Sequence, residues 1–338
     1  MSYRLILVLI FLLQVSCFSQ TPSNVLVVAN SNNTNSVVLA NTYMSARNIP
    51  NTNYLSLQYD PNDNSYTISL SDFTTNILNP ILNKINTIST RIDYIVLCRN
   101  LPYLITNGSL SVDNLIASKG SQQINNPYYT KTTVFNSATY NMYIVTRLDG
   151  LSWEDATALI TRASSPISAP FYYDCDPTKD SNSGYRFYNT LMRLASSLMN
   201  SKGKANTLEN TNTFGLPSAP VGLYISWGSN DAHYNATTYN SIPFARGCVA
   251  ETAVSTSASN LRVPGGTQSQ IATFVHNGVT GVSGYVAEPY VASCERPDTM
   301  STNYLAGRTL GETFFSSSRL IGWRGLVVGD PLCAPYKK

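Results

Sequence analysis

Charged and aromatic side chains recur where apolar runs of the sequence end, in IVLCR, IVTRLDG, FYYD, YISW and GYVAE. In open parallel sheets, the carboxyl ends of the strands line the crevice in which ligands bind. Charged groups there hold a ligand through ion pairs and hydrogen bonds, and a tryptophan offers a flat contact surface. We therefore predict a polar ligand-binding crevice that is built from Arg99, Arg147, Asp149, Asp174, Trp227 and Glu288.

The pair Arg147 and Asp149 also has a structural interpretation. Two residues apart on a strand, their side chains point to the same face and can pair with each other. A buried charge is tolerated when it is paired, and Asp174 is a further partner available to Arg147. A structural ion-pair network is the preferred interpretation of this pair. Under the binding hypothesis, Arg147→Ala weakens ligand binding while the fold persists.

A thiol and an imidazole, at Cys248 and His233, raise the alternative of a cysteine peptidase. Both residues lie in loop-like sequence, FARGCVAE and SNDAHYN, and no strand is expected just before the cysteine to aim its sulfur. A disulfide or plain packing is therefore the preferred role of Cys248. A hydrolase that works through carboxylates is also possible chemically, and its candidate residues are Asp174, Glu251 and Glu288.

The first 19 of the 338 residues have the layout of a secretory signal, because Arg4 precedes an apolar run that is too short to span a bilayer. We expect cleavage before Gln20 and a secreted or periplasmic protein. Lipoprotein anchoring through Cys17 is the less favoured alternative. No later segment is apolar for long enough to cross a membrane.

Composition and cysteine spacing limit the partners. The net charge is +3 without a basic cluster, which argues against nucleic acid. Neither a zinc-like spacing nor a glycine-rich phosphate loop is present, so we expect no metal and no cofactor. An odd number of cysteines follows the signal, which leaves at least one thiol outside any disulfide. These cysteines are Cys98, Cys175, Cys248, Cys294 and Cys333.

The elements that must position these residues alternate between apolar strands and helices. Strands are expected in residues 23–31, 53–60, 92–100, 141–150, 169–176 and 221–229, and the stretch 107–136 looks like a long surface insertion. An S-x-x-D capping box at Ser152 and Asp155 predicts a helix start. Strands that are apolar on both faces need helices on both faces. The sequence therefore predicts a doubly wound, mostly parallel α/β sheet in one domain, 20–338, with a possible sub-boundary near 205–220.

Several of these motifs, in order, resemble a group of exported bacterial proteins without an established activity. They are VLVVANS, IDYIVLCRNLP, YIVTRLDG, YISWGSN, GVSGYVAEPY and GWRGLVVGDP, and they extend from about Val25 to Pro335. The same order distantly resembles the gingipain-type cysteine peptidases. That resemblance implies a caspase-like α/β architecture.

The chain departs from the gingipain pattern where the chemistry of that family resides. The strand that should end in His-Gly ends in Ser226, Trp227 and Gly228, and Cys248 comes several residues before the expected nucleophile position. The usual dyad is therefore missing. We expect an exported non-peptidase that binds a peptide, glycan or protein ligand, and the alternative is a hydrolase that uses His233 and Cys248.

Overall fold

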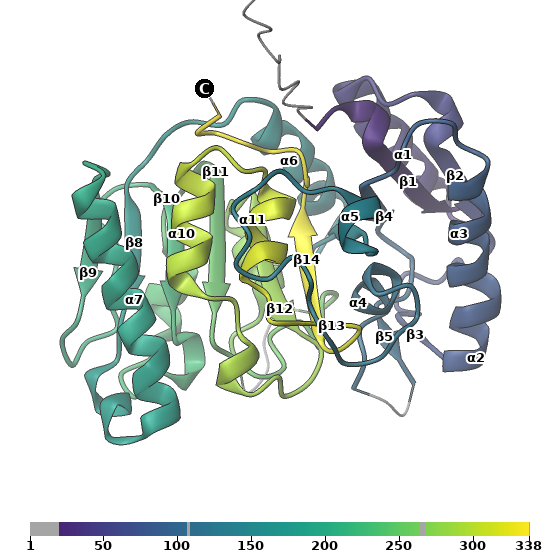
Figure 1. The fold of residues 1–338 in the computed structure, drawn as a ribbon. Helices are drawn as coiled ribbons and strands as arrows, with labels where there is room; N and C mark the ends of the chain where they lie inside the picture. The colour runs from purple at the N-terminus through teal and green to yellow at the C-terminus, as the bar shows by residue number, and fades with distance from the viewer. Residues whose placement is uncertain (1–19, 107–108, 264–267, 338) are drawn as a thin grey trace, which may run out of the picture.

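A computed structural model describes residues 20–106, 109–263 and 268–337 (Figure 1). The predicted signal, 1–19, and Cys17 within it lie outside the described residues. The described chain contains one ten-stranded sheet. In spatial order its strands are β2 (Tyr54–Leu57), β1 (Val25–Asn30), β4 (Tyr94–Cys98), β7 (Ile144–Leu148), β14 (Gly325–Gly329), β12 (Gly281–Tyr285), β11 (Phe244–Thr252), β10 (Val221–Ser226), β8 (Phe171–Asp174) and β9 (Asn206–Glu209).

The central strands of this sheet are buried on both faces. Every residue of β1, β4, β7, β8, β10 and β12 is buried, which explains their nearly continuous apolar runs. Parallel pairing joins β2, β1, β4 and β7 on one side and β12, β11, β10, β8 and β9 on the other. β14 lies between the two sets and is antiparallel to β12. The predicted mostly parallel α/β sheet is confirmed.

Helices cover both faces of the sheet. Figure 1 shows α10 (Pro297–Leu305) and α11 (Leu310–Ser317) in front of it and α6 (Trp153–Ser164) behind it. α6 contacts α1 (Thr34–Arg47) and α9 (Ile271–His276), and α10 contacts α7 (Ser183–Ser201). The remaining elements are short: α2 (Leu70–Phe73), α3 (Asn79–Asn86), α4 (Val112–Ala117), α5 (Ser137–Tyr140), α8 (Ala236–Asn240), β3 (Thr67–Ile68), β5 (Leu104–Ile105), β6 (Ile124–Asn125) and β13 (Leu320–Ile321).

The start of α6 confirms the predicted capping box. The Ser152 side chain accepts the backbone N–H of Asp155 at 3.1 Å, and Asp155 Oδ2 accepts the backbone N–H of Ser152 at 3.2 Å. Such caps satisfy N–H groups that have no partner inside the helix. The cap fixes the point where the chain leaves β7 and turns into α6, directly after Asp149.

One expectation about local structure was wrong, and another holds only in part. The segment around Cys248 is the nine-residue strand β11, not a loop. Arg246 and Gly247 interrupt its apolar pattern, and the pairing register with β10 shifts at this point. The stretch 107–136, described from residue 109 on, lies at the surface only in part. All of α4 is buried and Tyr128 and Phe135 have no exposed surface, whereas residues 121–125 and 130–133 are exposed.

All five described cysteines are free and buried, so no disulfide joins them. The predicted disulfide is therefore absent, and packing is the observed role of Cys248, which has no exposed surface. A search of the described residues finds no helix that is both long and apolar enough to pass through a bilayer.

Candidate functional site

Arg147, at the carboxyl end of β7, lies in a completely paired environment. Its guanidinium donates two hydrogen bonds to Asp113, at 2.8 and 2.6 Å, and one to Asp149 at 2.9 Å. It also donates to the carbonyl oxygen of Pro102 at 3.1 Å. The side chain of Arg147 has no exposed surface. This arrangement matches the structural interpretation of the pair, with Asp113 in place of Asp174 as the second carboxylate.

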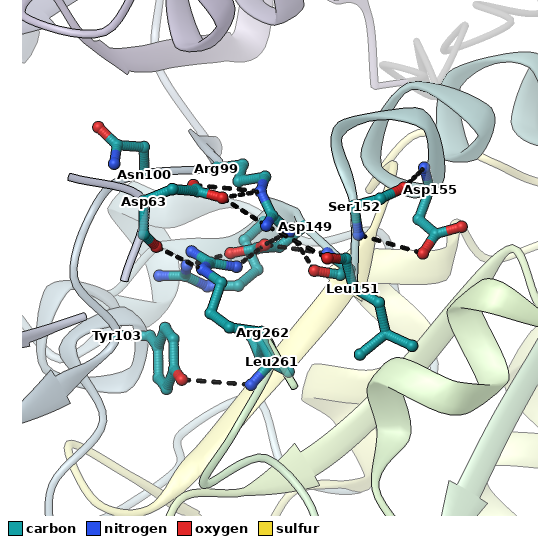
Figure 2. Close-up of polar contacts among 12 residues, drawn as sticks. Asp63, Arg99, Asn100, Tyr103, Asp149, Leu151, Ser152, Asp155, Leu261 and Arg262 are labelled. Carbon is teal, nitrogen blue, oxygen red and sulfur yellow. Dashed lines mark hydrogen bonds and ion pairs between the residues drawn. The ribbon is translucent and has the colours of Figure 1, made fainter. Parts of the chain in front are cut away.

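Two further arginines meet at Asp149 from loops that are distant in sequence (Figure 2). Arg99, which follows β4, contacts Asp149 at 3.4 Å and pairs with Asp63 at 2.6 Å. Arg262, which follows β11, forms an ion pair with Asp149 and donates to the carbonyl oxygen of Asp63 at 3.0 Å. Loops that follow strands on either side of β14 are therefore joined through the carboxylate of Asp149.

The charges of this ion-pair cluster balance. It contains three arginines (Arg99, Arg147 and Arg262) and three aspartates (Asp63, Asp113 and Asp149). Burial alone raises the pKa of Asp149, but the guanidiniums of Arg262, Arg147 and Arg99 outweigh it and hold the pKa below its ordinary value. The cluster therefore connects the loops to one another, and it leaves no unpaired charge on Arg147 or Asp149 for a ligand.

Asp174, at the end of β8, lies in a different environment. Both of its carboxylate oxygens face the backbone N–H of Gly215 at 3.3 Å, and the neighbouring charged groups are Asp231 and Glu209. Burial, together with these two carboxylates, raises the pKa of Asp174 to about 8. Burial also raises the pKa of Asp231 to about 6, and Asp231 Oδ2 has no hydrogen-bond partner among the described residues.

Trp227 and Glu288 line a pocket of about 300 Å³ at the carboxyl ends of β8, β10, β11 and β12, which we call the mouth pocket. Its described lining residues are Lys179, Tyr185, Trp227, Asn230, Ala253, Ser255, Glu288, Pro289, Val291 and Cys294. The Trp227 indole donates to Asn189 Oδ1 at 2.7 Å and packs edge-on against the rings of Tyr185 and Tyr188. Glu288 is exposed and accepts hydrogen bonds from Ser255 Oγ and from the backbone N–H of Tyr290, the latter at 2.8 Å. The tryptophan is thus held rigidly, while the carboxylate remains open to solvent.

The six predicted crevice residues therefore lie in three places rather than one. Arg99, Arg147 and Asp149 are in the ion-pair cluster, Asp174 is in a buried acidic group, and only Trp227 and Glu288 share a pocket. The common carboxyl edge of the sheet brings these groups to one side of the molecule. Buried pairing, which sequence alone does not reveal, separates their roles.

The structure does not bring His233 and Cys248 together. Cys248 lies within β11, directly before Val249, which pairs with Leu223 in the first half of β10. It therefore lies roughly 13 Å along the strand from Thr252, at a rise of about 3.3 Å per residue. His233 is exposed in the loop beyond the carboxyl end of β10. Burial raises the pKa of the Cys248 thiol well above its ordinary value, which disfavours a thiolate nucleophile.

The carboxylate candidate Glu251 is likewise removed from solvent. It has no exposed surface, and Tyr285 Oη donates to it at 2.6 Å. The same phenol contacts Glu295, and a phenol has only one proton to donate. At least one of the two carboxyls is therefore protonated, and burial, with Glu295 beside it, raises the pKa of Glu251 well above its ordinary value. His276 pairs with Asp155 at 3.2 Å, next to the capping box.

Three members of the ion-pair cluster, Asp63, Asp113 and Arg262, were missed by the sequence reasoning. None of them comes directly after an apolar run in the sequence, and each meets its partner through a contact between distant segments. Asp113 lies in the buried first turn of α4, which was taken for a surface insertion. The described residues contain no group of three or more His, Cys, Asp or Glu side chains that could hold a metal ion.

No family model matches the chain, and no curated protein matches it in sequence. Among solved structures, the fold resembles that of RgpB from Porphyromonas gingivalis in a complex of its pro- and mature domains. The TM-score is 0.51 at 11% identity, and the alignment covers 92% of this chain and 79% of that chain. A structure described as a protease aligns with a TM-score of 0.47 at 11% identity, over 94% of this chain and 80% of the other. The likeness to RgpB shows the fold, so the predicted gingipain-like architecture is confirmed.

Proposed function

We propose that this chain is an exported binding protein that uses a caspase-like fold without peptidase chemistry, and that it binds a peptide segment in the mouth pocket. One observation carries the proposal. Loops that follow four strands of the parallel set, β8, β10, β11 and β12, meet at this pocket, which is where open α/β sheets hold their ligands.

The pocket has the size and chemistry for one side chain of a peptide. Its volume of about 300 Å³ is small, and its wall includes the aromatic rings of Trp227 and Tyr185. Lys179 and Glu288 place a cation and a carboxylate at the same pocket, and Asn230 and Ser255 add neutral polar groups. Such a mixture of an apolar wall and a few polar groups is typical of small ligand sites. The resemblance to RgpB in complex with its own pro-domain adds support for a polypeptide ligand.

Catalysis is not part of the proposal, because the thiol and imidazole that it would need lie apart. Cys248 has no exposed surface and lies inside β11, whereas His233 lies in the loop beyond the carboxyl end of β10. The position equivalent to a strand-end nucleophile is occupied by Thr252 and Ala253, and Thr252 is buried. The mouth pocket therefore offers recognition without an activated nucleophile.

The test is capture of labelled protein on an array of short peptides. We expect a defined peptide set to bind, and Glu288→Gln to lose at least part of that set because a carboxylate at the pocket is neutralised. Glu154→Gln, which changes another exposed glutamate outside this pocket, is the matched control and should bind like the wild type. Peptide capture that is equal in both variants would contradict the proposed site, and capture on a glycan array alone would contradict the proposed ligand class.

Export has its own measurement. Mass spectrometry of the protein that is recovered outside the cytoplasm should show a chain that begins at Gln20, if residues 1–19 act as a signal. Recovery of a lipid-modified chain that begins at Cys17 would instead support lipoprotein anchoring.

A further inference from the structure

The mouth pocket contains a carboxylate that has no cationic partner. Glu288 is exposed, and its side chain forms no ion pair with the residues that the structure describes. The carboxylate accepts from two neutral donors, the Ser255 hydroxyl and the backbone N–H of Tyr290. Arg324 donates to the backbone carbonyl oxygen of Glu288 and not to its carboxylate. The pocket therefore presents a negative charge that is unpaired and open to solvent.

The cation of the same pocket, Lys179, is already neutralised but can still donate. Its Nζ lies 3.8 Å from Asp176 Oδ2 and 6.0 Å from the centre of the Trp227 ring in the pocket wall. A separation of 3.8 Å is too long for a hydrogen bond, and 23% of the lysine side chain is exposed. The ammonium therefore keeps N–H donors for a ligand. Lys179 and Asp176 cancel in charge, so the pocket has a net charge of about −1 from Glu288.

This combination matches the amino-terminal residue of a peptide. Such a residue carries one positive charge on its α-ammonium group, and its carbonyl acceptor lies next to the same carbon atom. A lysine or arginine side chain offers the cation, but its nearest carbonyl is several bonds away. A free amino acid adds a carboxylate, so its net charge is zero and it does not balance the pocket. A chain end with a free ammonium group satisfies both observations at once.

We propose that the mouth pocket binds the free amino terminus of a peptide, with the ammonium on Glu288 and the first carbonyl accepting from Lys179. This inference rests on the proposed function and narrows its ligand class. The first side chain is apolar and packs against Tyr185, which is 42% exposed and is held edge-on against Trp227 at 5.6 Å between ring centres. Val291 adds apolar surface to the same pocket.

The first test concerns the ammonium group. The probes are L-phenylalanine N-methylamide and its N-acetylated form, followed by ligand-observed NMR titration at about pH 6.5, where an α-amino group is mostly protonated. We expect the free amine to bind about tenfold more tightly, because acetylation removes the partner of Glu288. In Glu288→Gln the ratio should fall to about one. Glu154→Gln, an exposed glutamate outside the pocket, should keep the wild-type ratio.

The second test concerns the carbonyl group. 2-Phenylethylamine keeps the ring and the ammonium but lacks the carbonyl, so it should bind about tenfold more weakly than L-phenylalanine N-methylamide. In Lys179→Met this difference should disappear, while the preference for the free amine over the acetylated probe remains. Because Lys179 also pairs with Asp176, urea unfolding of the variant checks that it is folded under the conditions of the titration.

The outcomes separate this inference from the proposed function. Equal affinity for the free and acetylated probes overturns the inference, as does tighter binding of N-acetyl-L-lysine N-methylamide, which would indicate a side-chain cation. Tighter binding of free L-phenylalanine overturns it in favour of an amino acid ligand. On the peptide array, equal capture of peptides with free and acetylated amino termini would leave the peptide-binding function standing without this specificity. Capture of neither set would overturn both.

Discussion

Two buried aspartates at the same edge of the sheet, Asp149 after β7 and Asp174 at the end of β8, have opposite surroundings. Asp149 meets three guanidiniums, and its pKa is lowered. Asp174 meets one backbone N–H and two further carboxylates, and its pKa is raised to about 8. The sequence motifs that deliver them, TRLDG and YYDCD, look alike as strand ends.

The difference distinguishes charges that stabilise the fold from groups that can contact a ligand. Paired charges at the ends of β4 and β7 join loops from the two parts of the sheet, and the charged groups of Arg147 and Asp149 are paired within the protein. Around β8, β10 and β11 some buried polar atoms have no partner among the described residues, as at Asp231, and the mouth pocket lies at the ends of the same strands. Perturbed and unpaired groups are the ones that cluster at functional sites. Four changes test this comparison.

The largest effect is expected for Arg147→Met. Removing the guanidinium leaves Asp113 and Asp149 without their shared cation, and breaking a buried ion pair costs about 3–5 kcal/mol. Urea unfolding measures the loss. Arg193→Met is the matched control, because Arg193 pairs with Asp180 at the surface and such pairs contribute about 0–1 kcal/mol.

This expectation reverses the binding hypothesis for Arg147, under which the fold persists and only ligand capture weakens. An Arg147→Met variant that is as stable as the wild type but captures no peptide would restore that hypothesis. A matching loss of stability and of all captured peptides instead reflects unfolding.

The second change concerns pH and the sign of its effect. The pKa of Asp174 is raised from 3.8 to about 8 in the folded protein, so its contribution to stability is complete below 3.8 and is lost as the pH rises toward 8. We expect the wild type to lose stability relative to Asp174→Asn as the pH rises through this window, because the asparagine side chain does not titrate. Urea midpoints at intervals between pH 4 and pH 8 measure the difference.

Asp149 predicts the opposite sign, which sharpens the comparison. Its lowered pKa means that its contribution is present above the unfolded pKa and is lost as the pH falls. The wild type should therefore lose stability on the acid side through Asp149 and on the alkaline side of the window through Asp174. Parallel pH profiles for the wild type and Asp174→Asn would show that Asp174 is ionised in the folded state.

Much of the fold could be predicted from the sequence, because patterns among residues close in sequence specify it. The apolar runs of β1, β4, β7 and β10 and the capping box of α6 involve neighbours in sequence. β11 was not predicted as a strand, because Arg246 and Gly247 interrupt its apolar pattern where the pairing register with β10 shifts.

The candidate site was readable only in part. Strand ends indicated the correct edge of the sheet, and Trp227 and Glu288 do share a pocket there. Which charges are neutralised depends on Asp63, Asp113 and Arg262, whose contacts join segments far apart in sequence. No sequence periodicity indicates such partners, so a strand-end motif does not show whether its aspartate is paired.

A smaller effect on stability is expected for Trp227→Phe in the mouth pocket. The substitution removes the indole N–H that donates to the buried amide of Asn189, and one hydrogen bond contributes about 1 kcal/mol. Peptide capture should fall more than stability does, since the ring forms part of the pocket wall. Trp153→Phe, at the start of α6 and outside the mouth pocket, is the control. If both variants capture peptides equally, the Trp227 ring is not part of the recognition surface.

The smallest effect, none, is expected when His233→Ala is tested for the alkylation of Cys248. A catalytic imidazole would lower the thiol pKa and speed alkylation at neutral pH, whereas burial raises the pKa of Cys248 and hides its sulfur. Alkylation with iodoacetamide, followed by mass spectrometry, should therefore be slow at Cys248 in both proteins. Cys294 is the internal reference, because it lines the mouth pocket and should react first among the five buried thiols. Fast labelling of Cys248 that is lost in His233→Ala would indicate a catalytic thiol and imidazole, in a region where we infer only ligand binding.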